Sequence, residues 1–476
     1  MPAIPPRDPA ASAPPDDTDD DIARGGAGDV VPFGAAVRAW FRVSLQTFGG
    51  PAGQIAVMQR ALVEDRRWIG QQRFNHALSY CMLLPGPEAQ QLAIYIGWLL
   101  NGTRGGLVAG TLFVLPGVLA LLALSALYVG WGDTTVITGL FAGLAPAVLA
   151  IVAQAVIRVG RRSVTHPALI ALAVASFIAL AVFAVPFPIV IAAAAAVGWL
   201  LARLIPHAFT SAARHSGGDG PAPLIPDDVL HHEPPTWRRA AKVLAVGLVL
   251  WAVPVIAVAA ATGTGSVFTR QGLFFSGTAL VTFGGAYAVL AYVAQQAVQT
   301  YGWLTPGEMV RGLGLAETTP GPLIMVVQFV AFLGAYRDPG SLDPWAAALL
   351  GALLATWVTF VPCFIFIFLG APYVERLRGN RAISAALAGI TAAVVGVVAN
   401  LAVYFCLHTL FAGTRTADWG PVHLHLPDLG SLRPLALAIT VAAAVMIFKL
   451  RWSVLRTLGV CAALGLIAVV AGVPAG

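Results

Sequence analysis

The sequence predicts an all-α membrane protein that crosses the bilayer many times and consists of two related halves. Hydrophobic residues make up 58% of the 476 residues and charged residues only 11%, whereas roughly a quarter of a soluble protein is charged. Many apolar runs reach the ~20 residues that cross a bilayer. Several short motifs also recur at one fixed spacing, which is the signature of an internal duplication.

The duplication is visible in motifs that repeat after 235 residues. Thr-Phe-Gly-Gly at 47–50 recurs at 282–285, Trp68 recurs as Trp303, and Pro-Gly-Pro at 85–87 recurs at 320–322. Later in each half the spacing becomes 246, because the second half has a longer loop near 336–340. At that spacing three further residues find counterparts: Pro116 in Pro362, Gly143 in Gly389 and Gln154 in Asn400.

The membrane segments can be placed in order along the chain. Residues 1–32, rich in Pro, Ala and Asp, are predicted to be a disordered cytoplasmic tail without a cleavable signal peptide. The first repeat, 33–204, is expected to hold segments near 33–60, 74–101, 106–130, 134–158, 167–184 and 188–204. The last two form a tight hairpin or one long tilted helix. A polar linker (205–239) and a connecting transmembrane helix (240–262) follow. The second repeat, 263–476, is expected to hold segments near 271–299, 309–336, 345–370, 382–411, 433–449 and 453–472.

This order gives about 13 membrane segments with Pro/Gly-broken helices. Six segments per half preserve orientation, so the connecting helix inverts the second repeat, which predicts inverted-topology repeats. Most of the 28 Lys and Arg residues then fall on the side of the N-terminus, which favours a cytoplasmic N-terminus and a periplasmic C-terminus. The segments 33–60 and 74–101 could instead be re-entrant hairpins, which would leave the orientation of all later segments unchanged. The cytoplasmic side would then also hold Arg60, Arg66, Arg67 and Arg73. The sequence leaves this choice open.

The Pro-Gly-Pro breaks are the main candidates for a binding site. A proline inside a helix costs roughly 3 kcal/mol, and irregular backbone at membrane depth must be buried in protein or line a cavity. The helix that starts after each break presents free N–H groups and about half a positive charge, which bind oxyanions. Proline kinks for packing are the alternative, but paired interruptions in two repeats favour a substrate site. This hypothesis includes Pro85, Gly86, Pro87, Thr319, Pro320, Gly321 and Pro322.

Polar and glycine-rich neighbours of the breaks complete the predicted substrate-binding set. The motifs Phe48, Gly49, Gly50 and Pro51, with Phe283, Gly284 and Gly285, offer either backbone N–H groups or close helix packing. Amides near the breaks can donate hydrogen bonds to an oxyanion: Gln54, Gln90, Gln91 and Gln328. The matched pair Gln154 and Asn400 is expected to hydrogen-bond between helices instead.

Charged residues suggest further roles. Glu88, itself part of the binding set, and Glu317 stand beside the two breaks and are candidate proton-coupling groups, although a carboxylate in a first helical turn also simply favours the helix dipole. Arg38 and Arg42 either attract an anion or extend toward lipid headgroups. The histidines and the four cysteines lack metal-ligand spacing, so no metal or cofactor is expected. No ATP-binding loop is present, and the net charge of +6 encodes membrane orientation rather than nucleic-acid binding.

Five motifs resemble the chromate ion transporter (CHR) family: FGGPAGQI at 48–55, WI at 68–69, LPGPEAQQL at 84–92, IGW at 96–98 and FVLPG at 113–117. The second Phe-Gly-Gly and Pro-Gly-Pro set is similar to the long, two-domain form. The resemblance implies a non-enzymatic chromate efflux protein of the bacterial inner membrane, driven by the proton motive force, with sulfate as a structural analogue. A homodimer is compatible with it. The second half departs from the motifs at Ala286, which replaces Pro51, and at Leu323, which replaces Glu88.

Two alternatives to chromate export stay open from the sequence. One is a carrier of sulfate or another oxyanion, because tetrahedral dianions of similar size present the same oxygens to backbone N–H groups. The other is an anion channel or a membrane scaffold that transports nothing, for which paired breaks and inverted repeats would be unnecessary.

Overall fold

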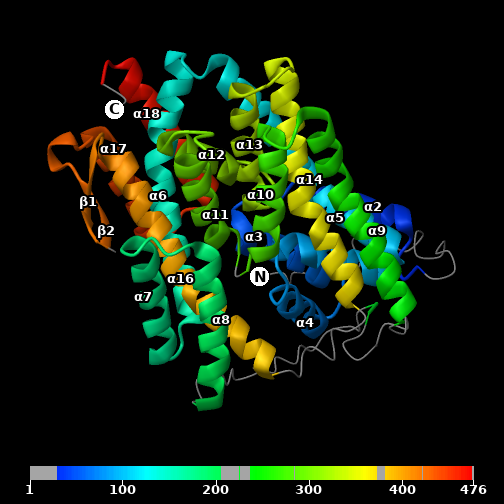
Figure 1. The fold of residues 1–476 in the computed structure, drawn as a ribbon. Coiled ribbons are helices and arrows are strands. Elements are labelled where there is room, and N and C mark those ends of the chain that lie inside the picture. The colour runs from blue at the N-terminus through cyan, green and yellow to red at the C-terminus, as the bar shows by residue number, and fades with distance from the viewer. Residues whose placement is uncertain are drawn as a thin grey trace, which may run out of the picture.

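The computed structural model describes residues 29–204, 224–225, 236–283, 285–371, 381–420 and 422–473. This part of the chain is mainly helical (Figure 1) and contains six helices long and apolar enough to cross a membrane, with four shorter apolar helices. The polytopic membrane architecture is therefore confirmed. Most of the predicted tail and linker lies outside the described residues, and so does Gly284.

The first half contains broken segments followed by long helices. Its elements are α2 (Phe33–Ser44), α3 (Gly50–Gln59), the π-helix η1 (Arg60–Asp65), α4 (Gln71–Cys81), α5 (Glu88–Trp131), α6 (Thr135–Ser163), α7 (Pro167–Ala181) and α8 (Phe187–Leu204). α5 is bent, because Asn101 and Gly102 have non-helical backbone angles. α7 and α8 are separate helices, so the tight hairpin is confirmed and the single long helix is wrong.

The second half follows α9 (Trp237–Thr262). Its elements are α10 (Val267–Val281), α11 (Ala286–Gln295), the π-helix η3 (Gln296–Thr300), α12 (Pro306–Thr318), the 3-10 turn η4 (Leu323–Met325), α13 (Val326–Arg337), α14 (Pro344–Gly370), α16 (Arg381–Leu410), β1 (Thr414–Trp419), β2 (Val422–Pro427), the 3-10 turn η6 (Leu429–Ser431), α17 (Pro434–Ala444), the π-helix η7 (Val445–Lys449) and α18 (Val454–Val470).

The early elements of the two halves correspond one to one. At the spacing of 235, α3 matches α11 and the π-helix η1 matches the π-helix η3. π-helices are rare and short, so a π-helix at the same place in both halves supports a common origin. Each half also breaks at the same two points, so that its first two apolar segments consist of helical pieces of 10–15 residues. Such pieces are shorter than the ~20 residues needed to span a bilayer.

A β-hairpin departs from the predicted all-α fold. β1 and β2 pair antiparallel from Thr414 opposite Pro427 to Trp419 opposite Val422. The alternation Val-His-Leu-His-Leu at 422–426 is typical of a strand, although no secondary structure was expected between 411 and 433. The hairpin covers the turn between α7 and α8, where the His423 N–H donates to the Val182 carbonyl at 2.7 Å.

The two halves interlock through equivalent glycine contacts. A Cβ on Gly143 of α6 would stand 2.9 Å from the Ala462 Cα of α18. A Cβ on Gly389 of α16 would stand 2.7 Å from the Gly198 Cα of α8. Gly143 and Gly389 are counterparts at the spacing of 246, so each half packs its long helix against the last helix of the other half. Small residues are needed at both crossings because the backbones approach so closely.

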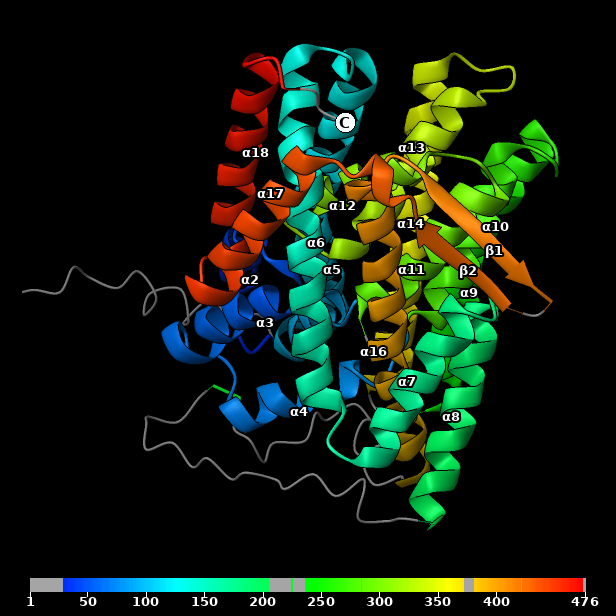
Figure 2. The same cartoon turned by 90° about the vertical axis from the view of Figure 1, so that its left-hand side faces the viewer.

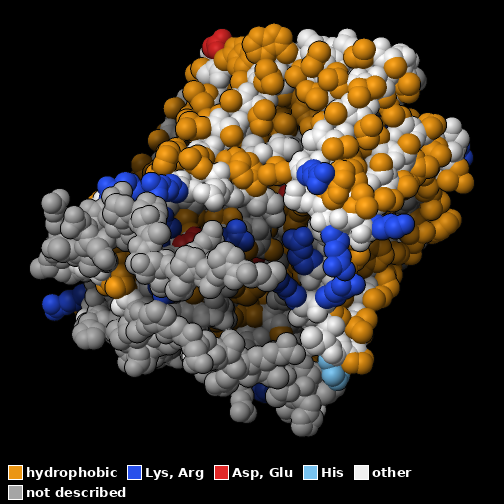
Figure 3. Space-filling model, turned by 180° about the vertical axis from the view of Figure 1, so that it is seen from behind, with side chains coloured by type: hydrophobic (Ala, Val, Ile, Leu, Met, Phe, Trp, Pro, Cys, Tyr) orange, Lys and Arg blue, Asp and Glu red, His pale blue; other side chains and the backbone are white. Residues whose placement is uncertain are grey.

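The arrangement of the helices gives the molecule two distinct ends. In Figures 1 and 2, α6 runs downward and its counterpart α16 runs upward, while α4 and its counterpart α12 lie toward opposite ends. Figure 3 shows hydrophobic side chains over the upper part of one face and Lys and Arg side chains gathered lower down. α9 is exposed, with only 6% of its most apolar stretch buried. Such a continuous apolar surface is suited to lipid rather than water.

Candidate functional site

The two Pro-Gly-Pro breaks meet through a reciprocal pair of hydrogen bonds. The Gly86 N–H donates to the Thr282 carbonyl at 2.7 Å, and the Gly321 N–H donates to the Thr47 carbonyl at 3.0 Å. Gly86 and Gly321 are counterparts at the spacing of 235, and so are Thr47 and Thr282. Each break is therefore anchored by the threonine that precedes the Phe-Gly-Gly motif of the other half. These four residues are called the central junction below.

Both junction glycines adopt backbone angles that other residues rarely reach. The φ angles are +125° at Gly86 and +98° at Gly321, in the region that favours glycine. A Cβ on Gly86 would stand 2.9 Å from Cys363 Sγ and 2.9 Å from Gln91 Nε2, whereas the nearest atom at Gly321 would be 3.4 Å away. The glycine of the first break therefore has less free space around it than the glycine of the second.

The long helices of both halves cover these breaks in the same way. Cys363 of α14 contacts Gly86, and Gly117 of α5 lies against Pro320 and Met325. Cys363 and Gly117 are counterparts at the spacing of 246, each directly after a helix proline. α14 therefore closes over the first break and α5 over the second.

The two breaks differ in the helix start that follows them. α5 begins at Glu88 after Pro87, and no side chain caps it. The first N–H groups of a helix have no intrahelical acceptor, so they are available to a ligand. After the second break the chain makes a 3-10 turn, in which the Met325 N–H donates to the Pro322 carbonyl at 3.0 Å, before α13 begins. The expected pair of equal helix N-termini is therefore realised fully only at the first break.

The predicted amides surround the junction and two of them support it directly. Gln54 Nε2 donates to the Gly321 carbonyl at 2.5 Å, and Gln91 Nε2 donates to the Pro85 carbonyl at 2.7 Å. Gln328 Nε2 reaches the Val118 carbonyl at 3.4 Å. Gln54 and Gln91 therefore lie beside the breaks with their amide nitrogens bonded to backbone, and their role in substrate binding stays a prediction.

Gln90 has no such partner. It is fully buried, and among the described residues neither its Nε2 nor its Oε1 has a hydrogen-bond partner. A buried polar group left unpaired costs about 1–3 kcal/mol. This amide, in the first turn of α5, is the strongest candidate for a ligand-binding side chain among the described residues near the breaks.

Two carboxylates converge on the start of α11. Glu317 is 3% exposed and accepts a hydrogen bond from the Tyr287 hydroxyl. Glu88 is half-buried, and its Oε1 lies 3.7 Å from the position of a Cβ on Gly285. Within the described ranges neither carboxylate forms an ion pair. Although they do not match in the repeat, Glu88 lies beside the residue before α11 and Glu317 bonds to the second residue of α11. Tyr287 was missed; its position two residues after the second Gly-Gly pair was the available signal.

The Phe-Gly-Gly residues form the loops before α3 and α11. Gly49 and Gly50 have φ angles of +81° and +72°, and Gly285 has +101°. Phe48 and Phe283 directly follow the junction threonines, and Pro51 lies in the first turn of α3. These motifs are therefore beside the junction, as expected, although no ligand contact is implied by their geometry alone.

Four residues from the sequence predictions lie away from the junction. Arg38 and Arg42 are on α2, and Arg42 lines a separate cavity of about 240 Å³. Gln154 and Asn400 were expected to hydrogen-bond between helices, and the described structure shows no such bond for either residue. Gln154 accepts from Arg158 on its own helix at 3.0 Å, where a charged donor one turn away outcompetes a neutral amide. Asn400 lines another cavity.

Comparison with known proteins agrees with this organisation. The family model described as Chromate transporter matches residues 35–199 and 270–468. A chromate transport protein of Pseudomonas aeruginosa is 32% identical over 368 residues, which cover 75% of this chain and 77% of that protein. One of Cupriavidus metallidurans is 30% identical over 365 residues, covering 76% and 80%. No solved structure matches. The chain belongs to the chromate transporter family.

Proposed function

We propose that this protein is a secondary active transporter that exports chromate across the bacterial inner membrane, driven by the proton motive force. The observation that carries the proposal is the central junction, where two broken membrane segments meet beside the unpaired amide of Gln90. Chromate would be held by the first N–H groups of α5 and by Gln90, because a helix N-terminus in a desolvated site stabilises an oxyanion. The relatives named as chromate transport proteins support this choice of substrate.

The domain division and topology belong to the same proposal. The two family matches support repeats at 33–204 and 263–476, and the opposite courses of α6 and α16 support their inversion. Inverted repeats are common among secondary transporters and place the substrate site near the middle of the membrane, where broken helices meet.

Hydrogen bonds to the linker favour re-entrant segments. Leu224 N–H donates to the Arg67 carbonyl at 3.0 Å, and Gly70 N–H donates to the Ile225 carbonyl at 3.3 Å. The loop after η1 therefore lies on the same side as the linker after α8. We infer that the segments 33–60 and 74–101 enter and leave on the cytoplasmic side. The N-terminus is then cytoplasmic, the C-terminus periplasmic, and the arginines of this loop strengthen the inner positive charge.

The driving force fits the charge of the substrate. Moving one charge across 100 mV is worth about 2.3 kcal/mol, so an exported dianion gains about 4.6 kcal/mol from an inside-negative potential. Glu88 and Glu317 would couple protons to this movement, because an ionised carboxylate and a dianion repel each other in one desolvated site. Replacing both with Gln should flatten the dependence of transport on the pH gradient.

The deciding experiment measures chromate uptake into inside-out vesicles and growth of a chromate-sensitive host. Wild-type vesicles should accumulate chromate under a proton motive force, and Gly86→Leu and Gly321→Leu should abolish uptake. Gly459→Leu is the matched control, because this exposed α18 glycine has no atom within 4 Å of an added Cβ. Unchanged uptake in the junction variants would reject the site. Stronger transport of sulfate would reassign the cargo, and a large uncoupled anion current would indicate a channel.

A further inference from the structure

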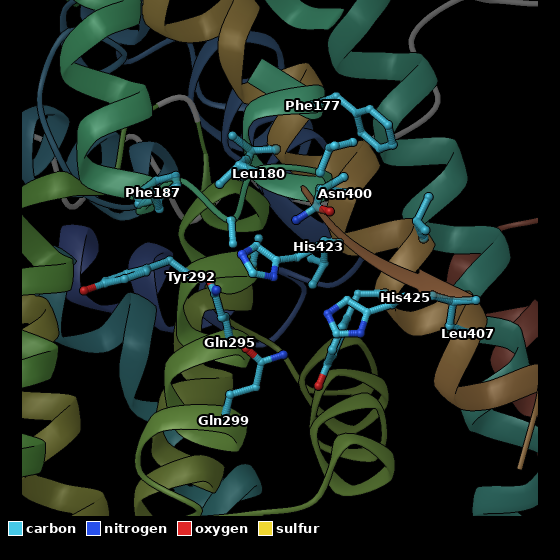
Figure 4. A pocket seen from close by; sticks show the side chains of 18 of the residues that line it. Phe177, Leu180, Phe187, Tyr292, Gln295, Gln299, Asn400, Leu407, His423 and His425 are labelled. Atoms are coloured by element: carbon cyan, nitrogen blue, oxygen red, sulfur yellow. The ribbon is translucent and has the colours of Figure 1, made fainter. Parts of the chain in front are cut away.

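A cavity of about 290 Å³ lies beside the C-terminal part of α11 and belongs to no site described so far. Its walls come from α11 and η3, from α16, from the turn between α7 and α8, and from β2 (Figure 4). The β-hairpin closes one side through the bond from His423 to Val182. The volume accommodates a small anion together with several water molecules.

Neutral hydrogen-bond donors converge in this cavity. Gln295 and Gln299 approach from α11 and η3, and Asn400 approaches from α16, with His423 and His425 between them (Figure 4). Within the described part of the chain, none of the three amides has a hydrogen-bond partner. The lining contains no Lys, Arg, Asp or Glu. These amides can donate hydrogen bonds to an oxyanion without holding it by charge.

The equivalent face of the first half lines the other cavity, of about 240 Å³, and there the chemistry is different. Arg42, Arg60 and Arg66 line it together with Asp65. Arg42 is close enough to Arg66 to act on it electrostatically. At the spacing of 235, Arg60 corresponds to Gln295, which means that an arginine in one cavity is replaced by an amide in the other. The first cavity is called the arginine cavity and the second the amide cavity.

Both cavities are connected to the central junction by equivalent helices. α3 begins shortly after Thr47 and leads through η1 to the arginine cavity, and α11 begins shortly after Thr282 and leads through η3 to the amide cavity. The next helices, α4 and α12, lie toward opposite ends of the molecule (Figures 1 and 2). Each cavity therefore lies along the C-terminal part of the helix that begins beside its own half of the junction.

We propose that the amide cavity is the periplasmic release site for a tetrahedral oxyanion, and that the arginine cavity is its cytoplasmic loading site. This inference rests on the proposed function and adds a second binding site to it. Guanidinium groups attract a dianion strongly and present paired donors to its oxygens, whereas amides bind it weakly and let it leave. The apparent affinity for substrate is then high on the cytoplasmic side and low on the periplasmic side.

Gln295→Arg tests the proposal by placing the first-half residue in the amide cavity. In right-side-out vesicles without a proton motive force, exchange of internal for external chromate should show an apparent KM for external chromate about tenfold lower, the effect of one added charge-assisted hydrogen bond. Thr300→Arg is the matched control, because it adds the same charge to η3 at an exposed residue outside the cavity lining. An equal KM for the wild type and both variants would overturn the proposal while leaving chromate export itself intact.

A labelling experiment keeps the proposal testable if Gln295→Arg does not fold. Gln299→Cys, combined with Cys406→Ser to remove the partly exposed native thiol, should react with a membrane-impermeant thiol reagent added outside cells. Added sulfate or chromate should slow that reaction. Absence of labelling, or labelling that neither anion slows, would reject the amide cavity as a substrate site, whether or not the wild type transports chromate.

Discussion

Replacement of Gln90 by methionine is expected to change stability and transport in opposite directions. Gln90 is fully buried and neither end of its amide has a partner in the described structure. Its counterpart in the second half is Met325, so the substitution introduces the side chain that the other repeat already carries. Removing an unpaired buried amide should recover part of the about 1–3 kcal/mol that it costs, and the melting temperature in detergent should rise.

Transport should respond in the other direction if Gln90 binds the substrate. A hydrogen bond to a charged group contributes about 1.5–3 kcal/mol, so its loss should lower kcat/KM for chromate by about 10- to 150-fold. The assay is initial uptake into inside-out vesicles, normalised to the amount of folded protein determined by size-exclusion chromatography.

Gln271 provides the comparison for this experiment. It is also fully buried, but its Nε2 donates to the Ala331 carbonyl at 3.1 Å, on α13 and away from the junction. Gln271→Met should lower the melting temperature and leave kcat/KM unchanged. If Gln90→Met also lowers the melting temperature and leaves kcat/KM unchanged, Gln90 is an ordinary packing residue and does not bind the substrate.

Three further predictions test the packing of the fold. Gly86→Ala should lower the melting temperature more than Gly321→Ala, because both force a side chain into left-handed backbone at about 1–2 kcal/mol, but only at Gly86 does the new Cβ stand 2.9 Å from neighbouring side chains; equal losses would contradict this. Gly143→Leu should prevent α6 from packing on α18 and yield aggregated protein in size-exclusion chromatography; a monodisperse, active variant would disprove the crossing. Arg337→Gln removes two hydrogen bonds to Glu308, of 2.6 and 3.0 Å. Since Arg337 is 46% exposed, this should cost about 1 kcal/mol or less, measured as a small, salt-dependent shift in melting temperature.

Much of the candidate site could be predicted because its signals are local. Two prolines on either side of a glycine cannot continue a helix, so the breaks were located from the Pro-Gly-Pro sequence alone. The fixed spacing then paired Gly86 with Gly321. Tyr287 could not be found in this way, because a tyrosine in an apolar segment is usually a packing residue, and only the fold places its hydroxyl on Glu317.

Other features of the structure were missed or wrongly predicted for identifiable physical reasons. The β-hairpin at 414–427 is short and lies between the apolar helices α16 and α17. Its few alternating residues are a weaker sequence signal than the apolar runs on either side. The interhelical hydrogen bonds expected of Gln154 and Asn400 were inferred from residue type and matched position, which do not record the neighbours on the same helix. Arg158, one turn along α6, supplies Gln154 with a near, charged partner.

The sequence by itself determined the membrane class, the duplication, the broken helices and the resemblance to a family, because composition and spacing are properties of neighbouring residues and of simple repeats. Only the tertiary structure decided that each break is anchored by the opposite half and that an arginine cavity and an amide cavity stand at equivalent places. Those features depend on contacts between segments far apart in the chain. Such contacts arise from the packing of both halves together, which no local pattern records.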